Sequence, residues 1–205
     1  MSENFMTLPL IPLRGISIFP NMIMHFDVGR EKSIAAIEAA MDNQIEIFLS
    51  TQKDYEIEEP SFDDIFEIGT ICKIKQIIKL PNNVIRVLVE GIDRGRLISI
   101  KDKEEYIESE VERIKEPSNE EYEGIEAYVN LLKKSFSKYL NISGNNRSSI
   151  MSIFGTIKNC SELADVVASY VIVDEDKRQE ILQEVDCIKR IEKLLVIIEN
   201  QIDIL

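Results

Sequence analysis

The residues of this sequence that could take part in chemistry are few, and their spacing matches no catalytic set. The only histidine, His25, lies in an apolar run, where a lone histidine is more often structural than a base or a metal ligand. The three cysteines, Cys72, Cys160 and Cys187, are far apart in the sequence, which favours reduced thiols over a disulfide framework or a zinc site. The sequence contains no P-loop, no G-x-S-x-G elbow and no H-E-x-x-H motif. We therefore expect no catalytic residue, no bound cofactor and no metal site in this chain.

Two groups of charged residues could instead hold an ion. The acidic run at 54–64, DYEIEEPSFDD, could collect a divalent cation, but its carboxylates lack the spacing of an EF-hand and a solvated loop is expected. Arg94 and Arg96 flank Gly95 and could grip a phosphate, although a turn between strands explains them more simply. We expect neither group to be a ligand site.

The stretch at 20–32, PNMIMHFDVGREK, joins an apolar strand to a charged turn. Alternation along the strand predicts Met22, Met24 and Phe26 on one face and Ile23 and His25 on the other, and one of these faces must fill the core. Methionine is an adaptable apolar side chain, so the other face suits a surface that holds apolar segments of varied sequence. The alternative is that both faces are core.

We predict that this stretch forms a partner-binding surface, in which a charged rim lies beside exposed apolar side chains. The predicted partner-binding residues are Leu10, Met22, Met24, Arg30, Glu31 and Lys32. The alternative is structural: Gly29 provides a turn, Glu31 lies favourably against the positive end of a helix dipole, and Lys32 is solvated.

The elements that must position these residues are of two kinds. From residue 7 to about 115 the apolar residues alternate or form short runs, with one helix at 30–42. Strands are expected at 7–13, 22–28, 45–51, 69–80, 84–91, 94–100 and 106–114. About seven strands with short connections predict a small barrel or sandwich. The two strands around Pro81-Asn82-Asn83 should form a hairpin. The strand at 7–13 should be an edge or entry strand, because its prolines cannot donate to a ladder.

Beyond residues 116–119 every segment has a helical period. Helices are expected at 120–140, at 148–157, after a Ser161 cap, after an Asp174 cap, and at 186–205. The last of these carries a heptad-like seam of Ile188, Ile191, Leu195, Ile198, Ile202 and Leu205. It ends without a stop signal, which predicts that it continues in a longer protein. The expected fold is therefore α+β, with a β-rich domain at 1–117 and an α-helical domain at 118–205.

The net charge and the apolar runs of the sequence indicate which partners and which cellular location to expect. The 205 residues carry a formal net charge of -13, which argues against nucleic acid and anionic membranes as partners. No apolar run approaches the roughly 18 residues that a membrane span needs, and the N-terminus lacks a signal-peptide pattern. A cytoplasmic protein is expected.

Four stretches carry a resemblance to a known family. They are LPLIPLRG with IFPNM (8–22), VGREKSIAAIEAAM (28–41), EIGTICKIKQIIKLPNNVIRVLVEGIDRGRL (67–97) and ILQEVDCIKRIEKLLVIIENQIDIL (181–205). In this order they resemble the N-terminal domain of the Lon family of ATP-dependent proteases, essentially end to end. Gly15, Asn21 and His25 depart from the usual pattern, although asparagine can still adopt the left-handed turn needed at position 21.

The resemblance implies a PUA-like pseudo-barrel followed by an α-helical subdomain. The parent would be a cytosolic homo-hexamer that uses ATP and Mg and cuts with a Ser–Lys dyad, both lying beyond residue 205. This segment would bind unfolded or damaged protein clients and adaptors, and alone it would be a monomer or a weak dimer. The alternatives are a stand-alone protein-binding domain, a purely architectural module whose last helix pairs with a neighbour, and an enzyme or RNA binder, which the net charge and missing motifs oppose.

Overall fold

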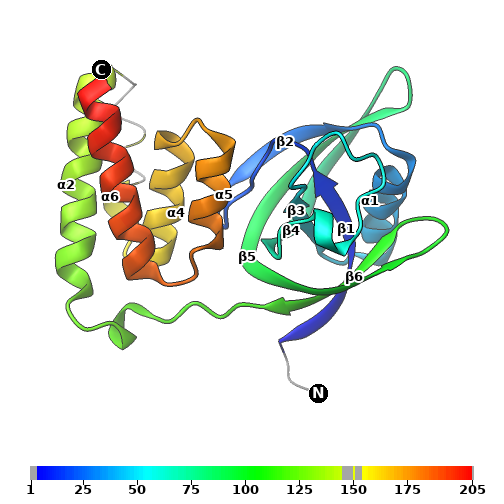
Figure 1. Cartoon of the computed structure of the whole chain (residues 1–205), viewed down its shortest axis with the longest axis horizontal. Coiled ribbons are helices and arrows are strands. Elements are labelled where there is room, and N and C mark those ends of the chain that lie inside the picture. Colours follow the sequence, from blue (N-terminus) through cyan, green and yellow to red (C-terminus); the bar gives the residue numbers. More distant parts are fainter. Residues whose placement is uncertain (1–3, 145–149, 151–153, 205) are drawn as a thin grey trace. The chain divides into compact units, whose positions relative to one another are not determined.

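The computed structural model describes residues 4–144, 150 and 154–204. It divides the chain into two compact units, Met1–Lys115 and Glu116–Leu205. The first unit holds the strands and helix α1 (Glu31–Asn43), and the second holds helices (Figure 1). The predicted α+β class is confirmed.

The first unit is a closed β-barrel with one additional strand. Its strands are β1 (Phe5–Leu13), β2 (Ile23–Val28), β3 (Ile47–Thr51), β4 (Ile68–Leu80), β5 (Val84–Asp102) and β6 (Ile107–Arg113). They follow the order β2-β5-β4-β3-β1-β6, and β6 also pairs with β5. Five strands therefore close a ring, which removes most free edges, while β2 has β5 as its one partner among the described strands.

Strand β5 replaces two of the strands that the sequence predicted. Residues 84–91 and 94–100 belong to one strand of 19 residues, so the expected turn at Gly95 is wrong and Arg94 is buried within the strand. Gly91 lets β5 pass close to the preceding chain, because a Cβ atom there would collide with the carbonyl oxygen of Phe19. At this crossing the Gly91 amide donates to the carbonyl oxygen of Met22 at 2.9 Å.

The prolines of β1 are accommodated because each half of the strand has a single strand partner. Residues Phe5–Pro9 pair antiparallel with β6, and residues Leu10–Leu13 pair parallel with β3. Of the two predicted alternatives, an edge strand is wrong for β1 as a whole, which lies between two neighbours, whereas β1 is the first strand of the barrel. Each half keeps one open side, and that is the side on which a missing amide donor costs least.

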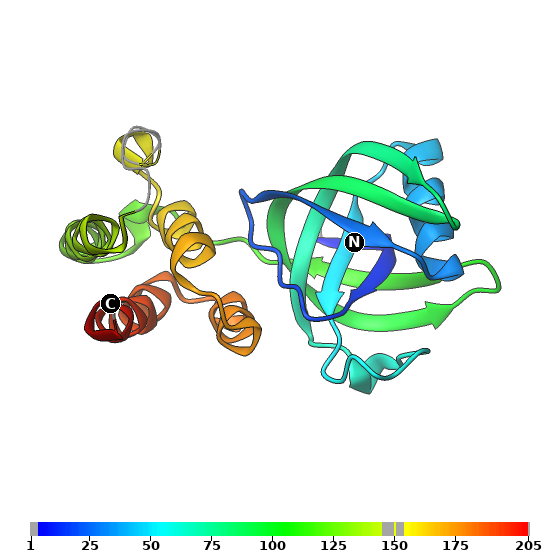
Figure 2. The ribbon, with the colours of Figure 1, turned by 90° about the horizontal axis from the view of Figure 1, so that it is seen from above.

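Helix α1 covers part of the barrel core. The helix lies against the strands of the barrel (Figure 2). Its buried residues Ala36, Ile37 and Ala40 pack in one cluster with residues of the strands, among them Phe26 and Val87. The predicted β4–β5 hairpin is confirmed, and its turn contains Asn82 and Asn83, both with positive φ (63° and 56°). Asparagine tolerates this left-handed conformation better than most residues.

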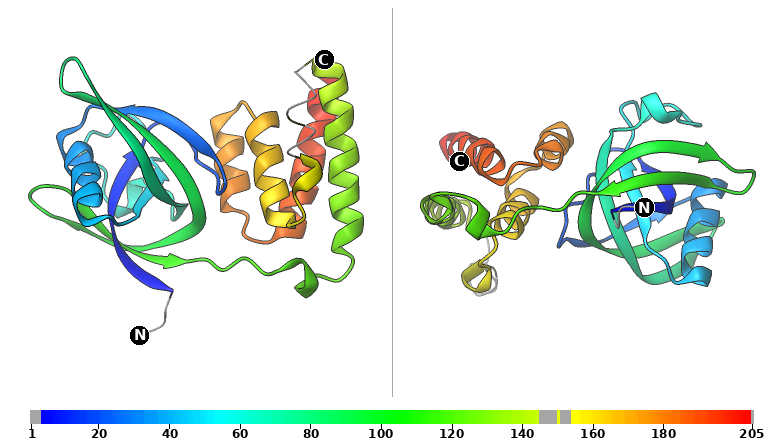
Figure 3. Two further views of the ribbon diagram at one scale, coloured as in Figure 1. Left: turned by 180° about the vertical axis from the view of Figure 1, so that it is seen from behind. Right: turned by 90° about the horizontal axis from the view of Figure 1, so that it is seen from below.

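In the second unit, the regular structure of the described residues is helical. Its elements include the short 3-10 helix η2 (Asn119–Glu121) and the helices α2 (Ile125–Ser143), α4 (Cys160–Val171), α5 (Glu175–Gln183) and α6 (Cys187–Ile204) (Figures 1 and 3). Of the helix expected at 148–157, residues 150 and 154–156 are helical, and residues 148, 149 and 151–153 lie outside the described residues. Among the described helices, none has both the length and the apolar composition that a bilayer crossing requires.

The caps and buried faces of these helices agree in part with those predicted from the sequence. Asp174 caps α5 as predicted, accepting a hydrogen bond from the amide of Lys177 at 3.1 Å. The cap of α4 is Asn159 rather than Ser161, because the Asn159 side chain accepts from the amides of residues 161 and 162. On α6 the fully buried apolar residues are Cys187, Ile191, Leu194 and Ile198. The predicted seam is thus correct at two of these positions, and Leu205 lies outside the described residues.

Candidate binding site at the start of helix α1

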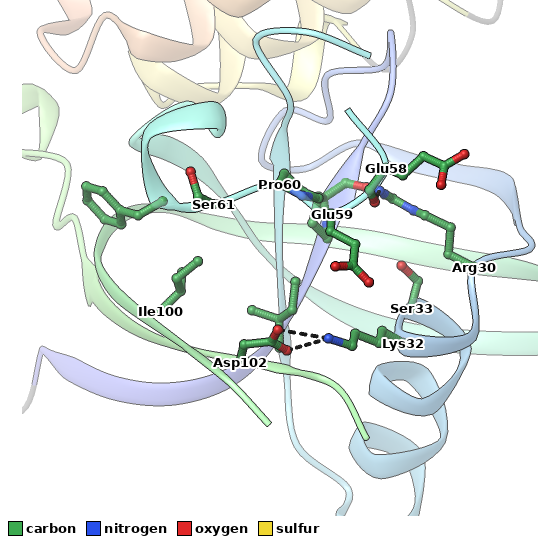
Figure 4. Close-up of a pocket in the computed structure, with 12 residues that line it drawn as sticks. Arg30, Lys32, Ser33, Glu58, Glu59, Pro60, Ser61, Ile100 and Asp102 are labelled. Carbon is green, nitrogen blue, oxygen red and sulfur yellow. Dashed lines mark hydrogen bonds and ion pairs between the residues drawn. The ribbon is translucent and has the colours of Figure 1, made fainter. Parts of the chain in front are cut away.

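The charged turn at the start of α1 lies between two hollows of the barrel unit. The first has a volume of about 410 Å³ (Figure 4). Its apolar lining is Pro12, Pro60, Phe62, Ile100 and Ile107. Its charged lining is Arg30, Lys32, Glu58, Glu59 and Asp102. The second hollow, of about 310 Å³, lies between the ends of β1 and β2 and shares Pro12, Arg30 and Ser33 with the first.

Arg30 separates the two hollows and is held firmly. Its guanidinium donates to Oε1 of Gln52 at 2.7 Å and to the carbonyl oxygen of Pro12. Burial, together with the nearby charge of Arg14, lowers the pKa of Arg30. These contacts make Arg30 part of the wall, because most of its donors already have partners inside the barrel unit.

The acidic segment at 54–64 forms another wall of the first hollow. Arg14 donates to the carbonyl oxygen of Ile57 at 2.9 Å, and Nε2 of Gln52 donates to the same oxygen at 2.9 Å. Figure 4 shows the Glu59 carboxylate pointing into the hollow and that of Glu58 pointing away from it. Within the described part of the chain, no three His, Cys, Asp or Glu side chains are grouped so that they could hold a metal ion.

Lys32 and Glu31 occupy the rim. Nζ of Lys32 lies 2.7 and 2.8 Å from the two carboxylate oxygens of Asp102, at the far end of β5. The hydrogen bond to Asp102 raises the pKa of Lys32, while burial acts in the opposite direction. Glu31 is exposed in the first turn of α1, where a carboxylate favours the positive end of the helix.

Of the three apolar residues predicted for the site, one is buried in the barrel and two are half-buried. Leu10 is 1 % exposed and packs in the cluster around Phe48 and Ile71, so its inclusion in a partner-binding surface is wrong. Met22 and Met24 are half-buried on the same face as Phe26, as alternation predicted, and Met24 packs against the core. Partner binding by these methionines and by Arg30, Glu31 and Lys32 remains a prediction.

The exposed apolar residues of this region lie on the opposite face of β2. Ile23 is 60 % exposed, and His25 and Ile78 are also exposed on the outside of the sheet. Beside them Arg86 binds both carboxylate oxygens of Asp27 at 2.7 and 2.9 Å, and this hydrogen bond lowers the pKa of Asp27. His25 and Asp27 share this face with Ile23, so the exposed face of β2 is the one without methionines.

Comparison with known proteins gives the family. Residues 7–200 match the family model described as the ATP-dependent protease La (LON) substrate-binding domain. The chain belongs to this family. The model that it matches describes a substrate-binding domain.

Relatives within the Lon family cover the whole chain. The Lon protease of Clostridium acetobutylicum is 46 % identical over 206 residues, which is 100 % of this chain and 26 % of that protein. Lon protease of Clostridioides difficile is 41 % identical over 202 residues, covering 97 % of this chain and 26 % of that protein. The chain therefore spans about a quarter of the length of these relatives.

Solved structures show the same fold. The N-terminal domain of a Mycobacterium avium complex Lon protease superposes with a TM-score of 0.76 at 19 % identity, covering 95 % of this chain and 99 % of that one. A Lon N-terminal domain protein from Xanthomonas campestris gives a TM-score of 0.65 at 16 % identity, covering 93 % and 98 % of the two chains. At such low identity the likeness concerns the fold alone.

Proposed function

We propose that this chain captures unfolded or damaged proteins for an ATP-dependent serine protease of the Lon type. The observation that carries the proposal is the match of residues 7–200 to a substrate-binding domain. ATP, Mg and a Ser–Lys dyad would belong to other parts of the protein, which would be a cytoplasmic homo-hexamer. Adaptor proteins would use the same surface.

The first hollow at the start of α1 is the site that best suits this function. An apolar lining with a charged rim can accept an apolar side chain of a client while its polar neighbours stay in water. Phe62 is 38 % exposed at this hollow, and Ile100 is half-buried beside it. Such a surface discriminates between folded and unfolded proteins, because only unfolded proteins expose many apolar side chains.

The test is fluorescence anisotropy with one labelled protein, used in its native form and in a form kept unfolded by reduction and carboxymethylation. We expect binding of the unfolded form only. Phe62→Ser should weaken this binding by about tenfold, the effect of losing roughly 1.4 kcal/mol of apolar contact. Phe5→Ser is the matched control, since Phe5 is 53 % exposed in the same unit but lines neither hollow.

Two results would contradict the proposal. Equal binding of native and unfolded forms would show that the surface does not select clients, and equal losses in both variants would show that the hollow is not the site. An architectural role would then be favoured by the exposed Val196 and Ile204 on α6, which offer an apolar face for self-association. Sedimentation equilibrium of the chain would detect that association directly.

A further inference from the structure

Strand β2 has an open edge. It pairs with β5 along Ile23–Val28, and none of the other described strands pairs with it. The second hollow, of about 310 Å³, adjoins the C-terminal end of β2 and is bounded across from it by the end of β1. An open edge next to an apolar hollow is the arrangement in which proteins bind an extended peptide as an added strand.

The hydrogen-bond pattern fixes which backbone groups point outward. The Gly91 amide donates to the carbonyl oxygen of Met22 at 2.9 Å, so the backbone carbonyl of Met22 points toward β5. The direction of the backbone groups alternates along an antiparallel strand, so the amides and carbonyls of Met24, Phe26 and Val28 also point toward β5. The amides and carbonyls of the intervening residues point toward the open edge. Those intervening residues are Ile23, His25 and Asp27. Among residues 4–144, no backbone partner reaches their outward groups.

We propose that an extended, apolar segment of an unfolded protein binds along this edge as an additional strand of the sheet. The inference rests on the proposed client-binding function and specifies how the client is held. Backbone pairing is independent of side-chain identity, which suits a domain that must accept clients of many sequences. Alternate side chains of the bound segment would enter the second hollow, whose apolar lining includes Ile11, Leu13 and Ile16.

The opposite side of the hollow does not compete for the client backbone. Pro12 of β1 has no amide hydrogen, and its carbonyl oxygen already accepts from Arg30. The end of β1 therefore offers neither donor nor acceptor at this point, and a client strand has β2 as its pairing partner. Arg30 thus blocks one edge while leaving the other available.

Proline substitution tests the edge directly. His25→Pro removes an outward amide without removing a bond to β5, whereas His25→Ala keeps that amide and changes only the side chain. With the carboxymethylated unfolded protein as probe, the proline variant should bind about tenfold more weakly than the alanine variant. Urea unfolding of both variants shows whether the barrel is intact. Equal affinities of two folded variants would overturn the proposal.

Hydrogen–deuterium exchange of the unmodified chain provides a second measurement, which does not depend on the fold of a variant. Saturating unfolded protein should slow exchange at the amides of Ile23, His25 and Asp27, and should leave the amide of Phe5 unaffected. Client binding without this protection would overturn the edge inference and leave the proposed function standing. Absence of any binding to the wild-type chain would overturn both.

Discussion

Among single residues of the helical unit, Arg190 is fully buried and carries a charge. Its guanidinium lies 2.8 Å from Oε1 of Glu116 and 3.3 Å from Oδ1 of Asp165, and it donates to the carbonyl oxygen of Glu184 at 2.8 Å. Burial acts to lower the pKa of Arg190, but the two carboxylates outweigh it and the pKa is raised. The charge is tolerated because it is paired on two sides.

Arg190→Met should therefore destabilise the chain strongly. It would leave the buried Asp165 carboxylate without this guanidinium, and removing one partner of a buried pair costs about 3–5 kcal/mol. Adding Asp165→Asn should recover part of that loss, since it removes the buried negative charge. Urea unfolding of the two single variants and the double variant measures the coupling. If the losses in free energy of unfolding from the two substitutions were strictly additive, Arg190 and Asp165 would not be coupled as a buried pair.

Individual side-chain positions were predictable only where the sequence alternates. The pattern around Met22 and Met24 correctly separated the two faces of β2, but it could not tell which face is buried. That choice depends on tertiary packing, in which Met24 contacts the core cluster shared by α1 and the strands while Ile23 stays outside. Leu10 was misplaced for the same reason, because the closed ring buries a residue that an edge strand would expose.

Within the strands, the glycines of β5 give a prediction at the scale of the element. Gly91→Ala should lower the free energy of unfolding by roughly 1–3 kcal/mol, as expected when a tightly packed position is overfilled. Gly29→Ala is the matched control, because its Cβ would lie 3.8 Å from the nearest atom, Cγ2 of Val84, at ordinary van der Waals distance. Urea denaturation compares the two. Equal losses of stability in the two variants would show that the close approach of Gly91 to Phe19 does not determine the stability of the barrel.

The kind of each described element was largely readable from periodicity, but some boundaries were not. The hairpin with Asn82 and Asn83 has a local sequence signal, so it was predicted correctly. The continuity of β5 had no such signal, because glycines in a bulged or closely packed strand look like a turn. The cap of α4 differed by two residues, since Asn159 and Ser161 are both good caps and only the surrounding packing selects between them.

For the molecule as a whole, we propose that its two units are separate domains. The sequence predicted domains at 1–117 and 118–205, whereas the compact units meet between Lys115 and Glu116. The contact of Glu116 with Arg190 gives this difference a physical meaning. A fragment of residues 116–205 should unfold at a higher urea concentration than one of residues 118–205. Its free energy of unfolding should be larger by about 1–3 kcal/mol, because the shorter fragment lacks the charged hydrogen bond of Glu116. Glu116→Gln in the longer fragment should remove most of that advantage, and equal stability of the fragments would contradict it.

The closure of the barrel through β1 and β6 also has a consequence for synthesis on the ribosome. Ser109 of β6 donates to the carbonyl oxygen of Leu8 at 2.9 Å, across 101 residues of sequence. Strand β1 emerges first, yet one of its two neighbours is made only at the end of the unit. The apolar faces of the earlier strands therefore stay exposed to solvent until β6 has left the exit tunnel, because the ring can close only then. A domain proposed to recognise unfolded chains thus passes through a long unfolded interval of its own.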